Sequence, residues 1–172
     1  MNDVASVCAC LADFEERAAA LYRKLAGRFS ENMKLCWFWV EMSLCEKQHA
    51  GFLQFCAAEE IITGELPGKQ AIRSLSKALD RLERKADRPV LSIDDAFLIA
   101  AELEKSEINA IYSRLIGPVH GSLYVLRKKI ETTTLGHIQA LTRAARKFDA
   151  SPSTIAKLSE LERQEVFKAS AR

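Results

Sequence analysis

Apolar residues recur along this chain at the alternating spacings of three and four that mark one face of a helix. Long runs of helix-forming residues, interrupted by few Gly and Pro, predict a chain built from helices alone. Long helices are expected over residues 3–29, 31–62, 93–116 and 119–148, and shorter ones over 69–86 and 152–169. Two long helices, a long connection that carries a short helix, and two further long helices are the order typical of an all-α four-helix bundle with one crossover.

Turn and capping residues set the limits of these helices. The segment 63–68, TGELPG, is the strongest turn signal in the chain and follows the second long helix. Ser92 can cap the third long helix, and Pro152 opens the last helix at the position where proline is best tolerated. We expect one domain, with the bundle over residues 1–150 and a docked C-terminal helix over 151–172.

Each long helix carries polar residues on the face that its apolar spacing marks as buried. In chain order these are Glu15, Glu46 with His49, Glu104 with Glu107, and Thr134 with His137. All of them fall near the middle of a helix, so antiparallel packing would bring them to about one level. A buried carboxylate is costly or becomes protonated, and four of them crowd like charges together. We therefore expect a cation to neutralise this cluster.

The residue types in the cluster predict a dinuclear metal site. Two ferrous ions would balance the charge of four glutamates, and His49 and His137 would add neutral nitrogen ligands. Carboxylate-rich sites with room for bridging suit iron, with manganese or zinc as substitutes, although zinc favours fewer ligands and tetrahedral geometry. The expected metal ligands are Glu15, Glu46, His49, Glu104, Glu107 and His137.

Each polar group taken alone also has an ordinary structural explanation. Glu46 and His49 could form a surface pair one helical turn apart. A single histidine such as His137 is more often a satisfied core residue than a ligand. Tyr22 and Tyr112 are either plain core aromatics or hydrogen-bond donors to ligand carboxylates. The metal site is favoured because four separate helical segments each place polar residues on the core-facing apolar stripe, at comparable depth.

Composition and charge exclude several classes of function. The 25 basic and 23 acidic residues leave a net charge of +2, which favours neither nucleic acid nor an acidic membrane as a partner. No apolar run approaches the roughly 18 residues of a membrane span, and residues 1–20 make a poor secretory signal. The five cysteines show no C-x-x-C spacing, so we expect free thiols, with the roles of Cys8, Cys10 and Cys45 left open. A cytoplasmic protein is expected.

Three stretches of the chain share a further pattern. They are FEERAAALYRKLA with Glu15 and Tyr22, CEKQHAGFL with Glu46 and His49, and ELEKSEINAIY with Glu104, Glu107 and Tyr112. These stretches resemble the rubrerythrin branch of the ferritin-like superfamily. The resemblance implies a left-handed crossover bundle that holds a non-haem di-iron site and reduces peroxide or oxidises ferrous iron. It also implies that Glu107 is the additional glutamate that marks rubrerythrins, and we expect Glu107 to be the catalytic residue that moves between metal states.

Two features depart from that family pattern. Where the family has a second E-x-x-H, this chain has Thr134 before His137, so a bridging carboxylate is absent and either one or two irons could bind. No rubredoxin module follows residue 150, so redox turnover would need an external electron donor. Dimers are common among such bundles, and we expect a homodimer.

Two functions therefore remain open from the sequence. The first is a rubrerythrin-like di-iron protein that reduces peroxide or oxidises and binds ferrous iron in the bundle core. The second is a degenerate ferritin-like bundle with one metal or none, whose protonated glutamates are hydrogen-bonded to the histidines and which serves as an interaction or regulatory module. Thr134 is the feature that favours the second.

Overall fold

The protein is helical throughout the part of the chain that the structure describes. The computed structural model describes residues 4–60, 66–105 and 122–170, and in the helix that follows residue 121 it describes side chains from Leu135 onward. Within these ranges there are six helices and no strand, which confirms the all-α class. The helices are α1 (Val4–Arg28), α2 (Met33–Ala58), α3 (Lys69–Ala86), α4 (Ile93–Glu104), α6 (Ser122–Lys147) and α7 (Pro152–Ser170).

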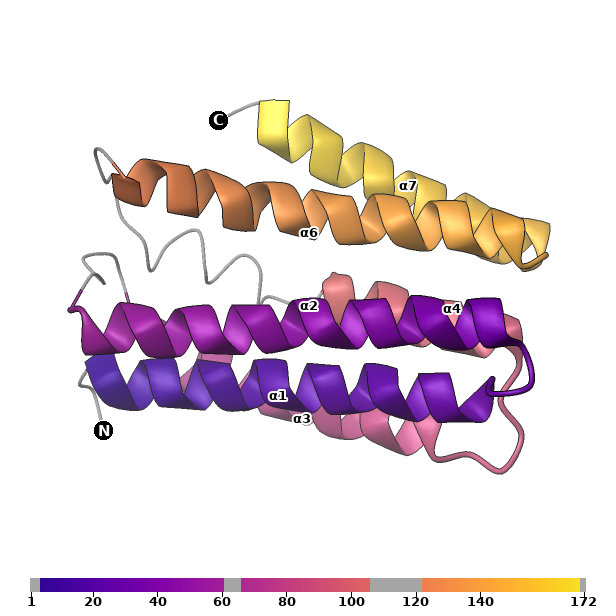
Figure 1. Cartoon of the computed structure of the whole chain (residues 1–172), viewed down its shortest axis with the longest axis horizontal. Helices are drawn as coiled ribbons and strands as arrows, with labels where there is room; N and C mark the ends of the chain where they lie inside the picture. Colours follow the sequence, from indigo (N-terminus) through magenta and orange to yellow (C-terminus); the bar gives the residue numbers. More distant parts are fainter. Residues whose placement is uncertain (1–3, 61–65, 106–121, 171–172) are drawn as a thin grey trace.

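The helices pack side by side along one long axis. α1 and α2 run antiparallel and share the most extensive contact among the described helices (Figure 1). α3 packs against α1, and α4 packs against α3. α6 lies along α4 and touches α2, and α7 runs back against α6 and reaches α4. None of the described helices is both long enough and apolar enough to cross a membrane.

Capping side chains fix the beginnings of α2 and α4. Asn32 precedes α2, and its side-chain oxygen accepts a hydrogen bond from the backbone N–H of Leu35 at 3.1 Å. Ser92 precedes α4 and forms a reciprocal capping box with Asp95, in which each side chain accepts from the other residue's backbone N–H. These bonds satisfy amide groups that a helix leaves unpaired at its first turn, so the sequence fixes where each helix begins.

The apolar stripes expected from the sequence form the core. Seam positions that are buried include Leu11, Ala18, Tyr22 and Leu25 in α1, Leu35, Trp39, Met42 and Leu53 in α2, Phe97 and Ala100 in α4, and Leu141 and Ala144 in α6. A polar bond also crosses this core, because Ser43 Oγ donates to the backbone oxygen of Ala19 at 2.8 Å. The spacing of apolar residues therefore predicted correctly which face of each helix is buried.

Two helices cover the outside of this core. α3 buries Leu75, Leu79 and Leu82, as its narrow stripe predicts, and packs against α1 and α4. α7 begins at Pro152, where Ser151 Oγ donates to Asp94 Oδ1 at 2.8 Å and thereby joins the start of α7 to the start of α4. The helix expected over residues 93–116 ends at Glu104 with Lys105 as its C-cap, and residues 106–116 lie outside the described part of the chain.

Candidate metal centre

Five of the polar residues that interrupt the apolar seams meet in the interior. Glu15 comes from α1, Glu46 and His49 from α2, Glu104 from α4 and His137 from α6. Each exposes between 2% and 8% of its surface, so the cluster lies in the core and not on a solvated face. The spacing of three residues in α2 places Glu46 and His49 on one side of the helix, which is the side that faces α1.

One half of the cluster lies between α1 and α2. Nδ1 of His49 is 2.8 Å from Oε2 of Glu46 and 3.9 Å from Oε2 of Glu15. One ligand atom from each of these three residues lies within 4.8 Å of the others, close enough to hold a single metal ion. Two carboxylates and one imidazole therefore face one another in this half.

The other half lies between α2, α4 and α6, and it uses the same shared carboxylate. Nδ1 of His137 is 3.4 Å from Oε1 of Glu46 and 3.4 Å from Oε1 of Glu104. This group of three also has ligand atoms within 4.8 Å of one another. The two oxygens of Glu46 thus point to different histidines, so a carboxylate in the position of a bridge belongs to both groups.

The electrostatics of the cluster depend on the pairing of acids with imidazoles. Burial alone would raise the pKa of Glu46, but hydrogen bonds from His137 and His49 and the charge of both rings hold that pKa well below its usual range. Burial would lower the pKa of His137, yet the charge of Glu104 and the neighbouring Cys45, Glu104 and Glu46 raise it far above its usual range. In the metal-free chain, the raised pKa of His137 favours a proton on this ring, which compensates the carboxylates of Glu46 and Glu104, and a bound metal ion would take its place.

Tyr22 on α1 holds the carboxylate of Glu104 in position by a hydrogen bond. Its hydroxyl donates a hydrogen bond to Oε1 of Glu104 at 2.7 Å, and its ring stacks on Trp39 with centroids 5.9 Å apart. Burial, followed by the charges of Glu104 and Glu46, raises the pKa of Tyr22 well above its usual value. The phenol therefore stays protonated and acts as a donor, which is the role of a residue that orients a ligand carboxylate.

The remaining predicted residues divide into two groups. Glu107 and Tyr112 lie outside the described residues, and so does the side chain of Thr134, although its backbone belongs to α6. Glu16 and Glu102, the neighbours of predicted ligands, lie outside the cluster and pair with Lys47 and Lys85 respectively. Periodicity thus separated inward-facing from outward-facing glutamates correctly in α1 and α4.

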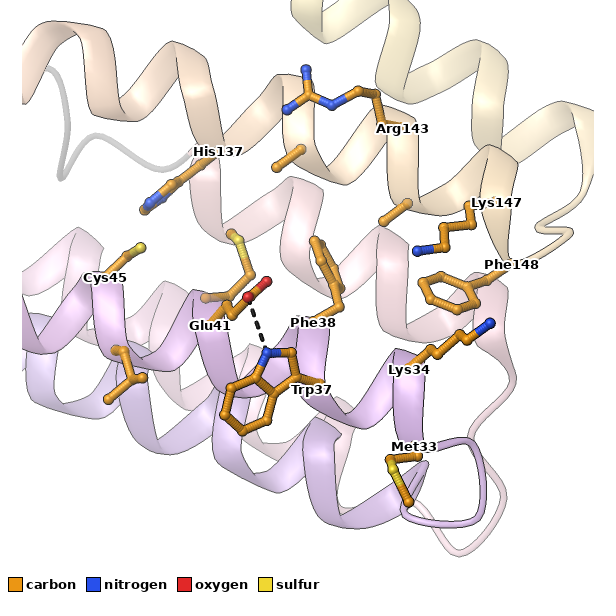
Figure 2. Close-up of a pocket in the computed structure, with 14 residues that line it drawn as sticks. Met33, Lys34, Trp37, Phe38, Glu41, Cys45, His137, Arg143, Lys147 and Phe148 are labelled. Carbon is orange, nitrogen blue, oxygen red and sulfur yellow. Dashed lines mark hydrogen bonds between the residues drawn. The ribbon is translucent and has the colours of Figure 1, made fainter.

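All five cysteines are free. Burial raises the pKa of Cys8 and raises that of Cys56 to about 11, so both behave as small buried hydrophobic residues. Cys45 is different, because it lies beside His137 at one end of an open groove between α2 and α6 (Figure 2). Neither this groove nor its aromatic lining was predicted from the sequence. The signal that could have found it is the composition of α2, which is apolar on more than one face.

The chemistry of the donor atoms fits a metal ion. Each half of the cluster offers carboxylate oxygens with one imidazole, a set that suits first-row metals such as iron or manganese. Nδ1 of His137 is the ring atom that faces the carboxylates. Its other ring nitrogen, Nε2, is buried and has no hydrogen-bond partner among the described residues. In comparisons with family models, curated proteins and solved structures, no match to this chain was found.

Proposed function

We propose that this protein is a ferritin-like, rubrerythrin-type non-haem iron protein that binds two metal ions in its core. The observation that carries the proposal is the sharing of Glu46, whose two oxygens face His49 on one side and His137 on the other. A pair of metal ions with a common carboxylate is the simplest occupant of two three-residue groups that overlap at one glutamate.

The packing of the helices supports a four-helix bundle with one crossover. α1, α2, α4 and α6 supply all the described residues of the cluster. The connection from the end of α2 at Ala58 to the start of α4 at Ile93 carries α3, which packs outside the others against α1 and α4. One long connection with two neighbouring helix pairs is the arrangement of ferritin-like bundles.

The activity that we propose is peroxide reduction or oxidation of ferrous iron. Paired iron ions at this position would supply two electrons to an O–O bond. The chain itself orients the ligands: Tyr22 holds Glu104, Glu46 accepts from both imidazoles, and the surrounding core excludes water. Glu107, which the family resemblance marks as the residue that moves between metal states, is proposed as the catalytic residue.

Anaerobic titration of the metal-free chain with ferrous ions tests the proposal. We expect about two ions per chain and a higher melting temperature, since a ligand that binds only the folded state must stabilise it. His49→Ala and His137→Ala should each lower the stoichiometry to about one, because each removes the only described imidazole of one half. Gln48→Ala, an exposed neighbour on α2, is the matched control and should bind iron as the unchanged chain does.

Absorbance after addition of peroxide to the loaded chain then measures oxidation of the bound ferrous ions. The expected result is a peroxide-dependent signal in the unchanged protein and none in the iron-free protein. Absence of bound iron together with an unchanged melting temperature would reject the metal site.

A second candidate function is a bundle that needs no metal. It is favoured by the position of His137, whose Nδ1 lies 3.4 Å from carboxylates of both Glu46 and Glu104, so that a proton can satisfy this half of the cluster. Such a protein would serve as an interaction or regulatory module. The ferrous titration separates the two candidates, because only the iron protein gains stability with added metal.

The remaining expectations are part of the same proposal. We propose a cytoplasmic homodimer that takes electrons from an external donor, as the resemblance to rubrerythrins implies. Sedimentation of the iron-loaded chain measures its subunit number, and re-reduction of the oxidised centre by added rubredoxin or a chemical reductant tests for external electron supply.

A further inference from the structure

The groove between α2 and α6 is a feature that the proposed function does not use. It has a volume of about 1080 Å³ and opens along one side of the molecule (Figure 2). Its walls are mainly apolar and include Trp37, Phe38 and Leu44 from α2, Ala140 from α6, and Phe148 from the turn that follows α6. This volume is at the upper end of the range of small-molecule sites, which are concave and mostly apolar.

The apolar walls of the groove are exposed to a degree that is unusual for such residues. Met33, Trp37 and Leu44 expose 82%, 60% and 53% of their surfaces. A contiguous exposed apolar patch of this kind usually marks a site that binds a ligand or a partner. Because burial of large apolar side chains is favourable, an occupant that itself presents a long apolar body fits these walls.

Charge is distributed unevenly along the groove. Among the described residues, Lys34, Arg143 and Lys147 line the groove together with one carboxylate, Glu41, which already accepts a hydrogen bond from Trp37 Nε1 at 3.1 Å. Lys34 and Lys147 lie together at one end, and His137 lies at the other end (Figure 2). The described part of the groove is therefore cationic at one end and apolar along its middle, and His137 of the cluster lies at the other end.

We propose that this groove binds a linear amphiphilic carboxylate of the fatty-acid class. Its carboxylate lies between Lys34 and Lys147, and its hydrocarbon chain runs past Phe38 towards His137. Along α6 the distance from residue 137 to residue 147 is about 15 Å at the usual rise per residue, which calls for a chain of medium or greater length. The inference rests on the groove alone and holds whether or not the cluster carries metal.

A second copy of the chain fits the groove less well. In an isologous contact the same patch meets itself, and this patch has three cationic groups against one carboxylate. Two net-positive patches repel each other, whereas an anionic amphiphile neutralises the lysines and covers the apolar walls. Charge complementarity therefore selects the carboxylate.

Calorimetric titration of the full-length, metal-free chain with dodecanoate, kept below its micelle concentration, tests the proposal. We expect saturable binding of one molecule per chain, together with a change in the fluorescence of Trp37, since the other tryptophan, Trp39, is fully buried. Dodecyltrimethylammonium has the same tail and the opposite head charge, and it should bind at least about tenfold more weakly.

Paired variants assign the binding to the groove. Lys34→Glu with Lys147→Glu should weaken dodecanoate binding by about tenfold or more, whereas Lys77→Glu on the exposed face of α3 should leave it unchanged. Leu44→Gln should also weaken binding, and Phe55→Gln is its control, because Phe55 is 51% exposed on the same helix but lies outside the groove. Each substituted side chain is exposed, and circular dichroism confirms that the variants are folded.

Three results would overturn the proposal. The first is no saturable binding of dodecanoate. The second is equal affinity for the two head groups or for the groove and control variants, which indicates non-specific adsorption. The third is a dimer in sedimentation that Leu44→Gln converts to monomers, which assigns the groove to a second copy of the chain.

Discussion

Glu46 is the residue on which both halves of the cluster depend. It is buried and faces two imidazoles. Burial raises the pKa of Glu46, but the two imidazoles lower it by more, so the pKa lies below its usual range. Each imidazole also has a second carboxylate, Glu15 for His49 and Glu104 for His137. Removal of Glu46 therefore still leaves one carboxylate beside each histidine.

Glu46→Leu separates a functional from a structural role for this carboxylate. We expect iron binding to fall below one ion per chain, and the melting temperature of the metal-free variant to equal or exceed that of the unchanged protein, because apolar replacements of buried charges are often neutral or stabilising. Glu16→Leu on the surface of α1 is the control for metal binding. A loss of about 3–5 kcal/mol in the metal-free variant, measured by denaturant unfolding, would instead indicate a structural ion pair.

The cluster residues of α2 and α4 lie on helices whose beginnings are fixed by capping side chains. α4 is the clearest case, since Ser92 and Asp95 form a capping box and α4 carries Glu104 at its other end. The hydroxyl of Ser92 donates to Asp95 Oδ2 at 2.7 Å, and the backbone N–H of Ser92 also donates to it. These bonds lower the pKa of Asp95 below its ordinary value. The cap therefore sets the register of α4 and with it the depth of Glu104.

Ser92→Ala should destabilise the protein by about 1 kcal/mol at neutral pH, as expected for loss of an N-cap. Because the pKa of Asp95 is lower in the folded than in the unfolded chain, the bonded carboxylate adds stability above about pH 4 and loses it as the pH falls through the folded value. The difference between the variant and the unchanged chain should shrink in that acid range. Urea unfolding at a series of pH values measures it, with the exposed Ser74→Ala on α3 as the control. A difference that is constant with pH would contradict the assignment.

Across the described helices, α3 is joined to α1 by a charged contact as well as by its buried leucines. Arg17 on α1 donates through Nε and Nη2 to the two carboxylate oxygens of Glu83, both at 2.9 Å, and its Nη2 also reaches Asp80 at 2.6 Å. The hydrogen bond to Glu83 is the main reason that the pKa of Arg17 is raised. A two-pronged guanidinium contact of this kind fixes orientation as well as distance.

Arg17→Lys should destabilise the protein nearly as much as Arg17→Ala, by about 1 kcal/mol. The reason is that an ammonium group cannot donate two parallel hydrogen bonds to one carboxylate as the guanidinium does. The effect should decrease at high salt, since the pair is partly exposed. Lys24→Ala, which breaks a more exposed contact with Asp87, should cost less. Guanidinium is itself ionic, so urea unfolding with and without added salt is the suitable measurement. Full retention of stability by Arg17→Lys would show that only charge matters here.

Much of this fold could be predicted because its signals are local. The helix bounds follow from residues such as Asn32, Ser92 and Pro152, and the buried faces follow from apolar spacing. The same spacing put Glu15 and Glu46 on buried faces, where the structure has them. Glu16 does not fall on the buried stripe of α1, and it pairs with Lys47 at the surface. Tyr22 is expected from the sequence to be either a plain core aromatic or a donor to a carboxylate of the cluster, and it is a buried aromatic whose hydroxyl donates to Glu104. The role of Glu104 as a metal ligand stays a prediction.

What the sequence determined by itself is the set of helices and the side of each one that avoids water, since both depend on neighbours within about a turn. Only the tertiary structure decided which oxygen of Glu46 faces which histidine, because that depends on the depth and rotation at which α1, α2, α4 and α6 pack. It also decided that α2 and α6 lie far enough apart to leave a groove that exposes Trp37. Distances between helices are set by the packing of many side chains at once, so no single stretch of sequence specifies them.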